Sequence, residues 1–243
     1  MFGTYTYASN LFNLPNTLVT ALAVSLIPAV AGDRVRGTAA DGNVAAALEV
    51  GLLIACTGAV GLGVLAKPIL ALLYGSGVEE AAVSLAAKLL AILCLGIPPL
   101  ALTTVTNAIH QASGRASLPA VSMVLGCAVK VVSNCILLRN PSVRILGAAV
   151  STVLCYTVIA GIGWALLPNR PSLAQILGKS VAVAFPTGAV AVFVRHLSVG
   201  VMNEKIATLL AVFCGAACCF ALASLAEFSF FKKKYDEKSE KLE

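Results

Sequence analysis

The chain has 243 residues, of which 59% are hydrophobic and 12% charged, and its mean hydropathy is +0.93. A soluble domain is about 45–50% apolar and about 25% charged, so this composition excludes both an ordinary soluble fold and a disordered chain. The net charge of +6 comes from basic residues scattered between apolar runs, which argues against nucleic-acid binding and leaves a polytopic membrane protein as the prediction.

Seven apolar stretches are long enough to cross a membrane as helices, which takes about 20 residues. None alternates polar and apolar residues as a barrel strand would, so we predict an all-α fold. The membrane domain then covers residues 1–231, and the charged segment 232–243 is a cytoplasmic tail. The predicted spans cover residues 10–31, 44–66, 84–110, 118–138, 145–167, 178–196 and 205–227.

Two features interrupt the predicted spans. After the second span, Lys67-Pro68 introduces a short apolar segment that ends at Gly75, and we interpret it as an interfacial extension. The strongest predicted helix break is the Pro98-Pro99 pair in the third span, because proline removes a backbone donor and kinks a helix. Such a break either bends during transport or is a static kink filled by packing, and both interpretations stay open.

The charges between the spans predict an orientation. If the N-terminus lies outside and the spans alternate, the cytoplasmic side carries more Lys and Arg than the outer side, although Arg139 and Arg144 go against the trend. We therefore predict an N-out, C-in arrangement. Seven spans that start outside without a signal sequence are expected to be half of a larger protein.

Lys130 is the one ionisable residue predicted to lie deep within a span, where a charge that faces lipid is costly. Asn134 follows one helical turn later on the same face. Lys130 either meets an anionic substrate headgroup in a hydrated cavity, or it extends toward the membrane surface or toward backbone carbonyls. We take Lys130 and Asn134 as candidate substrate-binding residues.

Further polar residues lie in the first and third spans. Asn13 and Asn107 carry amides that need partners in an apolar medium, so they either bridge helices or line a polar cavity that binds substrate. His110 and Arg115 fall at the cytoplasmic end of the third span, where we expect a gate or a contact with a lipid phosphate.

Residues for enzyme chemistry are missing from the predicted spans. The spans contain no carboxylate pair for acid–base work, and the sequence has no nucleophile elbow or phosphate-binding loop. The eight cysteines lie in apolar stretches without the partners of a metal site, so we interpret them as small packing residues. We expect a transporter with no catalytic residues, no metal and no cofactor.

Five segments resemble, in the same order, the C-terminal half of stage V sporulation protein B and related polysaccharide exporters. That family lies in the multidrug/oligosaccharidyl-lipid/polysaccharide exporter superfamily, together with the MurJ-like lipid II flippases. The five segments are YTYASNLFNLPNTLVTALAVSLIPAVAG (5–32), GLGVLAKPILALLYG (61–75), VTNAIHQASGRASLP (105–119), GCAVKVVSNCILL (126–138) and ILGAAVSTVLCY (145–156).

The resemblance implies a fourteen-helix transporter with two lobes, which flips undecaprenyl-pyrophosphate-linked sugars across the bacterial cytoplasmic membrane by alternating access. The seven spans here would be the eighth to fourteenth helices, and the partners would be the lipid-linked sugar, membrane lipids and a missing N-terminal lobe. Lys130 alone matches a basic position of the family. The expected role is a flippase lobe in cell-envelope or spore-wall synthesis, made as a fragment.

Two alternatives stay open at this stage. One is a cation-coupled multidrug exporter of the same superfamily, which would favour an acidic residue in the cavity where this chain has Lys130. The other is an accessory membrane protein that does not transport anything.

Overall fold

The computed structural model describes residues 2–35, 41–75, 78–139, 144–167, 170–199, 203–219 and 221–222. Within these residues the regular structure is entirely helical. The helices are α1 (Phe2–Val35), α2 (Asp41–Val64), α3 (Ala66–Tyr74), α4 (Glu80–Cys94), α5 (Ile97–Ala112), α6 (Ser117–Leu137), α7 (Arg144–Ala165) and α8 (Leu173–Val199). A further helix covers residues 204–219.

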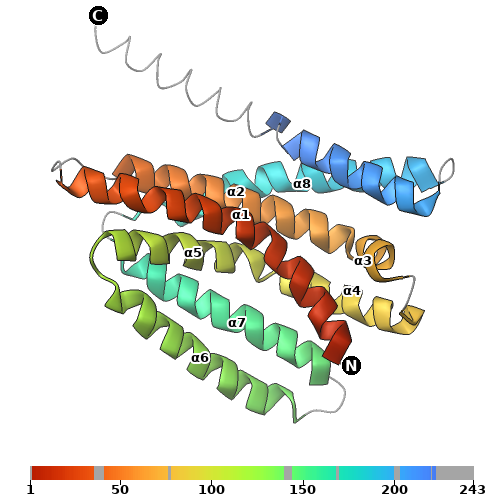
Figure 1. Ribbon diagram of the computed structural model, residues 1–243, viewed down its shortest axis with the longest axis horizontal. Helices are drawn as coiled ribbons and strands as arrows, with labels where there is room; N and C mark the ends of the chain where they lie inside the picture. Colours follow the sequence, from red (N-terminus) through yellow and green to blue (C-terminus); the bar gives the residue numbers. More distant parts are fainter. Residues whose placement is uncertain are drawn as a thin grey trace, which may run out of the picture.

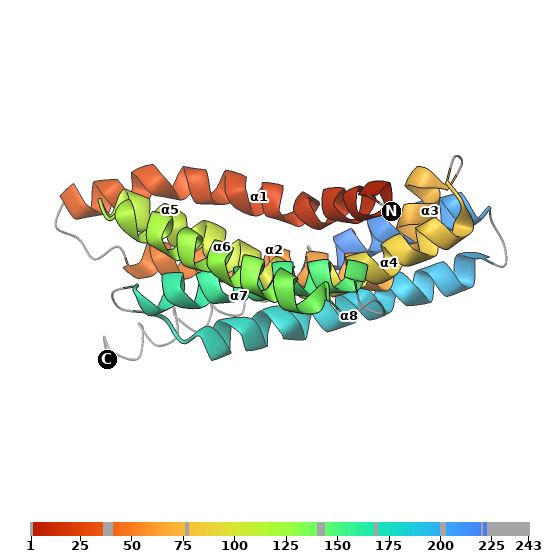
Figure 2. The same cartoon turned by 90° about the horizontal axis from the view of Figure 1, so that it is seen from below.

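The long helices lie side by side in an elongated bundle, and successive spans run in opposite directions (Figures 1 and 2). We call the end that holds the start of α1 and helix α3 the N-terminal end of the bundle. The turn between α5 and α6 lies at the opposite end (Figure 1). Helices α6 and α7 form one edge of the bundle, and α8 with the helix over 204–219 forms the other.

Five helices are long and apolar enough to cross a membrane, and the α4–α5 pair provides a sixth crossing if it is counted as one span. This confirms the predicted all-α polytopic membrane protein. The seventh predicted span, 205–227, lies only partly within the described residues, and the predicted tail lies outside them, so both stay predictions. The five helical spans are Gly3–Gly32, Val44–Val64, Ser117–Leu137, Ile145–Ala165 and Leu173–Ser198.

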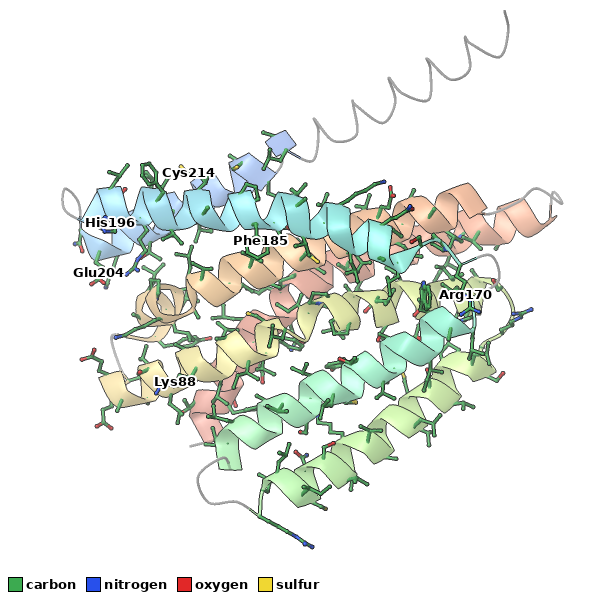
Figure 3. All side chains as sticks on the ribbon, turned by 180° about the vertical axis from the view of Figure 1, so that it is seen from behind. Lys88, Arg170, Phe185, His196, Glu204 and Cys214 are labelled. Atoms are coloured by element: carbon green, nitrogen blue, oxygen red, sulfur yellow. The ribbon has the colours of Figure 1, made fainter. Side chains whose placement is uncertain are left out.

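Charged side chains mark the two ends of the bundle (Figure 3). Lys88, His196 and Glu204 lie toward the N-terminal end, and Arg170 lies at the opposite end. Between them, α8 presents the aromatic ring of Phe185, which is 69% exposed. An apolar middle zone with charges at both ends is the arrangement that a bilayer imposes on a helical protein.

The third predicted span is broken in the structure. Helix α4 ends at Cys94, α5 begins at Ile97, and the two are bent by 47°. Pro98 and Pro99 occupy the first turn of α5, where a backbone N–H would lack an intrahelical acceptor in any case. The interruption therefore lies just before the prolines, at Leu95 and Gly96, and the prolines begin the next helix.

Helix α5 is the centre of the bundle. It packs against α1, α2 and α7, and most of its residues are buried. The adjoining part of α4 is equally enclosed, with Leu89, Leu90 and Leu93 at most 1% exposed. Because α5 also carries threonines, Asn107 and His110, polar groups lie in the middle of the protein and must find partners there.

A close approach between α1 and α2 depends on Gly58. A Cβ atom at that position would lie 2.8 Å from Cγ and 2.9 Å from Cβ of Pro15, whose ring cannot rotate away. We expect Gly58→Ala to force the helices apart and to lower the free energy of unfolding by about 1–3 kcal/mol.

The matched control is Gly61→Ala on the same helix, because nothing lies within 4 Å of a Cβ there. Alanine is the better helix former, so this change is expected to be neutral or slightly stabilising. Both variants are compared by thermal unfolding in detergent micelles. Equal unfolding midpoints for Gly58→Ala and Gly61→Ala would contradict the prediction, because α1 and α2 would then accommodate the added methyl group without a loss of stability.

Candidate functional site

Lys130 lies on α6, half-buried beside α7. Its ammonium group is near enough to act electrostatically on the Cys155 thiol of α7. Among the described residues the ion pairs are Lys67–Glu80, Lys179–Glu49 and Arg195–Glu204, so no described carboxylate neutralises Lys130. Lys130 is therefore a cation within a membrane span that has no carboxylate partner among the described residues.

Asn134 joins α6 to α7. The hydroxyl of Ser151 donates to the Asn134 Oδ1 atom over 2.5 Å, and Ser151 is fully buried. This hydrogen bond makes Asn134 a bridge between α6 and α7, and its predicted contact with substrate stays a prediction. The bridge lies one turn from Lys130 and fixes the part of α6 that carries it.

Removing this bridge is expected to loosen the edge of the bundle. Ser151→Ala leaves the Asn134 oxygen without its donor, which costs about 1 kcal/mol of stability. The measurement is the unfolding midpoint in detergent micelles. Thr157→Ala is the control, because the Thr157 hydroxyl is exposed and bonds only the Val153 carbonyl of its own helix. A loss of stability no greater than that of Thr157→Ala would contradict a structural role for the bridge.

Asn107 is buried on α5, and its Oδ1 atom has no hydrogen-bond partner within the described part of the chain. Thr104, three residues earlier and so on the same helix face, donates to the Asn16 Oδ1 atom of α1 over 3.0 Å. Helix α1 therefore packs beside the part of α5 that carries Asn107. An unpaired buried amide oxygen costs roughly 1–3 kcal/mol, so this acceptor is a place where a donor from water or substrate would be favoured.

His110 and Arg115 occupy different environments. His110 is 1% exposed, and its Nε2–H donates to the Gly163 carbonyl of α7 over 2.9 Å. A Cβ on Gly163 would lie 2.7 Å from the Thr106 hydroxyl, so glycine allows this approach of α7 to α5. His110 thus bridges α5 and α7 in the interior of the bundle, and its role as a gate or phosphate contact stays a prediction.

Arg115 is exposed in the turn after α5. Its backbone N–H donates to the His110 carbonyl over 2.9 Å, and Gly114 adopts the left-handed conformation with φ 70° that closes this kind of helix end. The turn holds Arg115 at the end of the bundle opposite α3 (Figure 1). Its role as a gate or phosphate contact stays a prediction.

Asn13 belongs to a polar row that the sequence analysis missed. Along α1 the exposed positions Thr6, Asn10, Asn13, Thr17 and Thr20 follow one another at intervals of four and three residues, which places them on one face. This face lies in the apolar span Gly3–Gly32. We call these five residues the α1 polar row; the interval pattern was the signal that could have found it.

Three side chains of the α1 polar row are oriented by hydrogen bonds within their own helix. The hydroxyls of Thr17 and Thr20 donate to the carbonyls of Leu14 and Asn16 over 2.7 and 2.8 Å. The Asn13 Nδ2 atom donates to the Ser9 carbonyl over 2.9 Å. Because their protons are used within the helix, the threonine oxygens are left as acceptors on the exposed face.

The predicted substrate residues lie on three helices, with Asn13 on α1, Asn107 on α5, and Lys130 and Asn134 on α6. Asn13 is exposed and Asn107 is buried, and no described contact joins them. Helix α7 contacts α1 and α6, since Tyr156 stacks on Phe12 of α1 with ring centroids 6.1 Å apart and Lys130 of α6 acts electrostatically on Cys155. A cation, amide groups and hydroxyl acceptors can hold a phosphorylated sugar by charge and hydrogen bonds.

Comparison with protein families finds a match for nearly the whole chain. The family model described as lipid II flippase MurJ matches residues 2–232 of the chain. A search of curated proteins found no match. The family consists of integral proteins of the cytoplasmic membrane that move a lipid-linked cell-wall precursor, so the expectations of a transporter and of a lipid-linked oligosaccharide substrate are confirmed.

Proposed function

Because the chain belongs to the lipid II flippase MurJ family, we propose that its helices form the lobe equivalent to the eighth to fourteenth helices of an alternating-access transporter. The observation that carries this proposal is the α1 polar row. Five polar side chains on the exposed face of a membrane helix are unfavourable against lipid, so this face is suited to a water-filled path or to a second lobe.

The proposed substrate is an undecaprenyl-pyrophosphate-linked sugar. Lys130 provides the positive charge for the pyrophosphate, and Asn107 has an acceptor without a partner among the described residues. The α1 polar row provides further acceptors for the hydroxyl and amide donors of a sugar headgroup. Asn134 supports this site by bridging α6 to α7 beside Lys130.

The proposed orientation places the N-terminal end of the bundle outside the cell. Arg115 and Arg170 then lie at the cytoplasmic end, in agreement with the preference of basic loops for that side. The bend between α4 and α5 gives a position at which the two halves of that span could tilt during transport. The proposed process is synthesis of the cell envelope or the spore wall.

The test is flipping of fluorescent lipid II in proteoliposomes. Vesicles contain the chain alone, or the chain together with a separately expressed lobe made of the first seven helices of a full-length family member. We expect the chain alone to flip no faster than protein-free vesicles and the pair to flip measurably. A chain that flips equally fast with and without the added lobe would contradict the lobe assignment, and so would a pair that stays inactive although both lobes are inserted and associated.

A further inference from the structure

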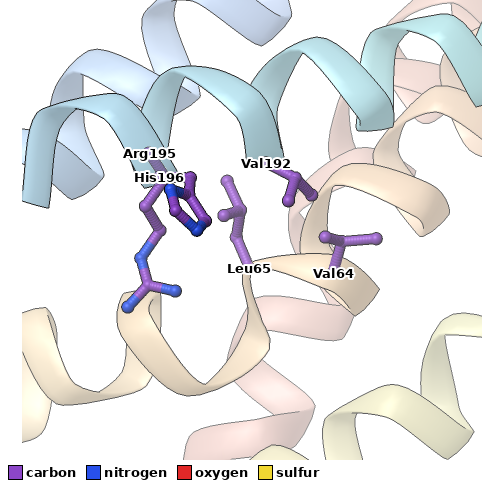
Figure 4. Close-up of a pocket in the computed structure, with 5 residues that line it drawn as sticks. All are labelled: Val64, Leu65, Val192, Arg195 and His196. Carbon is purple, nitrogen blue, oxygen red and sulfur yellow. The ribbon is translucent and has the colours of Figure 1, made fainter.

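A hollow at the N-terminal end of the bundle is separate from the residues proposed for transport. It has a volume of about 270 Å³ and lies between the end of α2 and the last turns of α8. Arg195 and His196 extend from α8 toward the turn between α2 and α3, beside Val64, Leu65 and Val192 (Figure 4). We call these five residues the Arg195 pocket.

The Arg195 pocket lies where two apolar spans end. The apolar span of α2 is Val44–Val64 and that of α8 is Leu173–Ser198, so both spans end at the pocket. Helix α3 begins directly after Leu65 of the pocket. It carries Lys67, whose Nζ atom lies 3.7 Å from Glu80 Oε1. Arg195 and His196 are near the end of the α8 span and beside the end of the α2 span, where basic side chains can meet lipid phosphates.

The guanidinium group of Arg195 is poorly matched within the described residues. Its Nη2 atom lies 3.6 Å from Glu204 Oε1, which is longer than a hydrogen bond, and the carboxylate is 75% exposed. Its Nε atom is buried without an acceptor in the described structure. The connection over residues 200–202, Gly-Val-Met, carries no carboxylate that could serve as another partner. A guanidinium group has five N–H donors, so Arg195 has capacity for an anion.

The surroundings of the pocket fit a lipid better than a free anion. Val64 and Val192 are exposed within the pocket. Val192 lies one turn before Arg195 within the α8 span, so the pocket has apolar surface on the membrane side of its charged groups. A phosphate with an attached acyl chain would use both parts, whereas inorganic phosphate would use only the charged part.

We propose that the Arg195 pocket binds an anionic membrane phospholipid, with Arg195 and His196 on the phosphate and the acyl chains along Val64, Val192 and the exposed face of α8. Glu204 competes with the lipid for Arg195. The bound lipid would contact both α2 and α8 one turn beyond the tight contact between them, in which a Cβ on Gly188 would lie 2.5 Å from Val60 Cγ1.

Native mass spectrometry of the full chain from detergent micelles tests the proposal. The micelles contain equal amounts of dioleoylphosphatidylglycerol and dioleoylphosphatidylcholine. We expect the wild-type chain to retain the anionic lipid preferentially and Arg195→Gln to lower this retention about tenfold, as for loss of one charge-assisted contact. His196→Gln should lower it less. Glu204→Gln should raise it, because the competing carboxylate is removed.

Lys88→Gln is the control, because it removes one positive charge from an exposed position toward the same end of the bundle. Equal losses for Lys88→Gln and Arg195→Gln would overturn the pocket and indicate a general surface charge effect. Displacement of the lipid by excess inorganic phosphate would overturn the lipid as ligand in favour of a free anion. If Arg195→Gln does not fold, the variants His196→Gln and Glu204→Gln still test the proposal, because both residues are exposed. Unchanged lipid retention in both variants would contradict it.

Discussion

Lys130→Ala is expected to slow lipid II flipping about 10- to 100-fold in the two-lobe proteoliposome assay. The side chain is a half-buried cation in a membrane span, without a described carboxylate partner. A hydrogen bond to a charged group contributes about 1.5–3 kcal/mol, which corresponds to roughly that range of rates if the contact forms as the headgroup enters the cavity. Lys130→Arg keeps the charge and is expected to retain most of the activity.

Lys88→Ala is the matched control for this prediction, since Lys88 is an exposed lysine on α4 outside the proposed site. Its flipping rate should equal that of the wild-type chain. Thermal unfolding of each variant separates a lost contact from a damaged fold. If Lys130→Ala folds normally and flips at the wild-type rate, the headgroup role of Lys130 is wrong, and a lysine that extends toward the membrane surface becomes the better explanation.

The all-α membrane class could be predicted from the sequence because a long apolar run is visible in adjacent residues. The α2 span Val44–Val64, for example, falls within the predicted 44–66. The interruption of the third span also followed from local chemistry, because proline is tolerated in the first turn of a helix and disfavoured in its interior. Both predictions used information that lies within a few adjacent residues.

The neighbours of each polar residue could not be predicted in this way. His110 lies at the end of an apolar run, where a surface position is the natural expectation. Its burial depends on Gly163, 53 residues later, which lets α7 approach closely enough for a 2.9 Å hydrogen bond. Asn134 likewise depends on Ser151. In helices whose faces are almost equally apolar, periodicity does not show which face meets a neighbour.

The second large effect is expected for the α1 polar row. The double variant Thr17→Val/Thr20→Val removes two hydroxyl acceptors and preserves the shape of both side chains. If this face lines the path of the headgroup, flipping should fall about tenfold, since each lost hydrogen bond contributes about 0.5–1.5 kcal/mol. Stability should change little, because each hydroxyl bonds only a carbonyl of its own helix.

The control Thr17→Ser/Thr20→Ser keeps both hydroxyls and removes two methyl groups, so its flipping rate should stay near that of the wild-type chain. The two double variants differ in polarity and not in position, and they therefore separate a polar path from a packing surface. A face that meets lipid would give the reverse order: the valine variant would be more stable and equally active, because apolar side chains are favoured there. That outcome would place the headgroup path away from α1 and leave Lys130 as the remaining candidate.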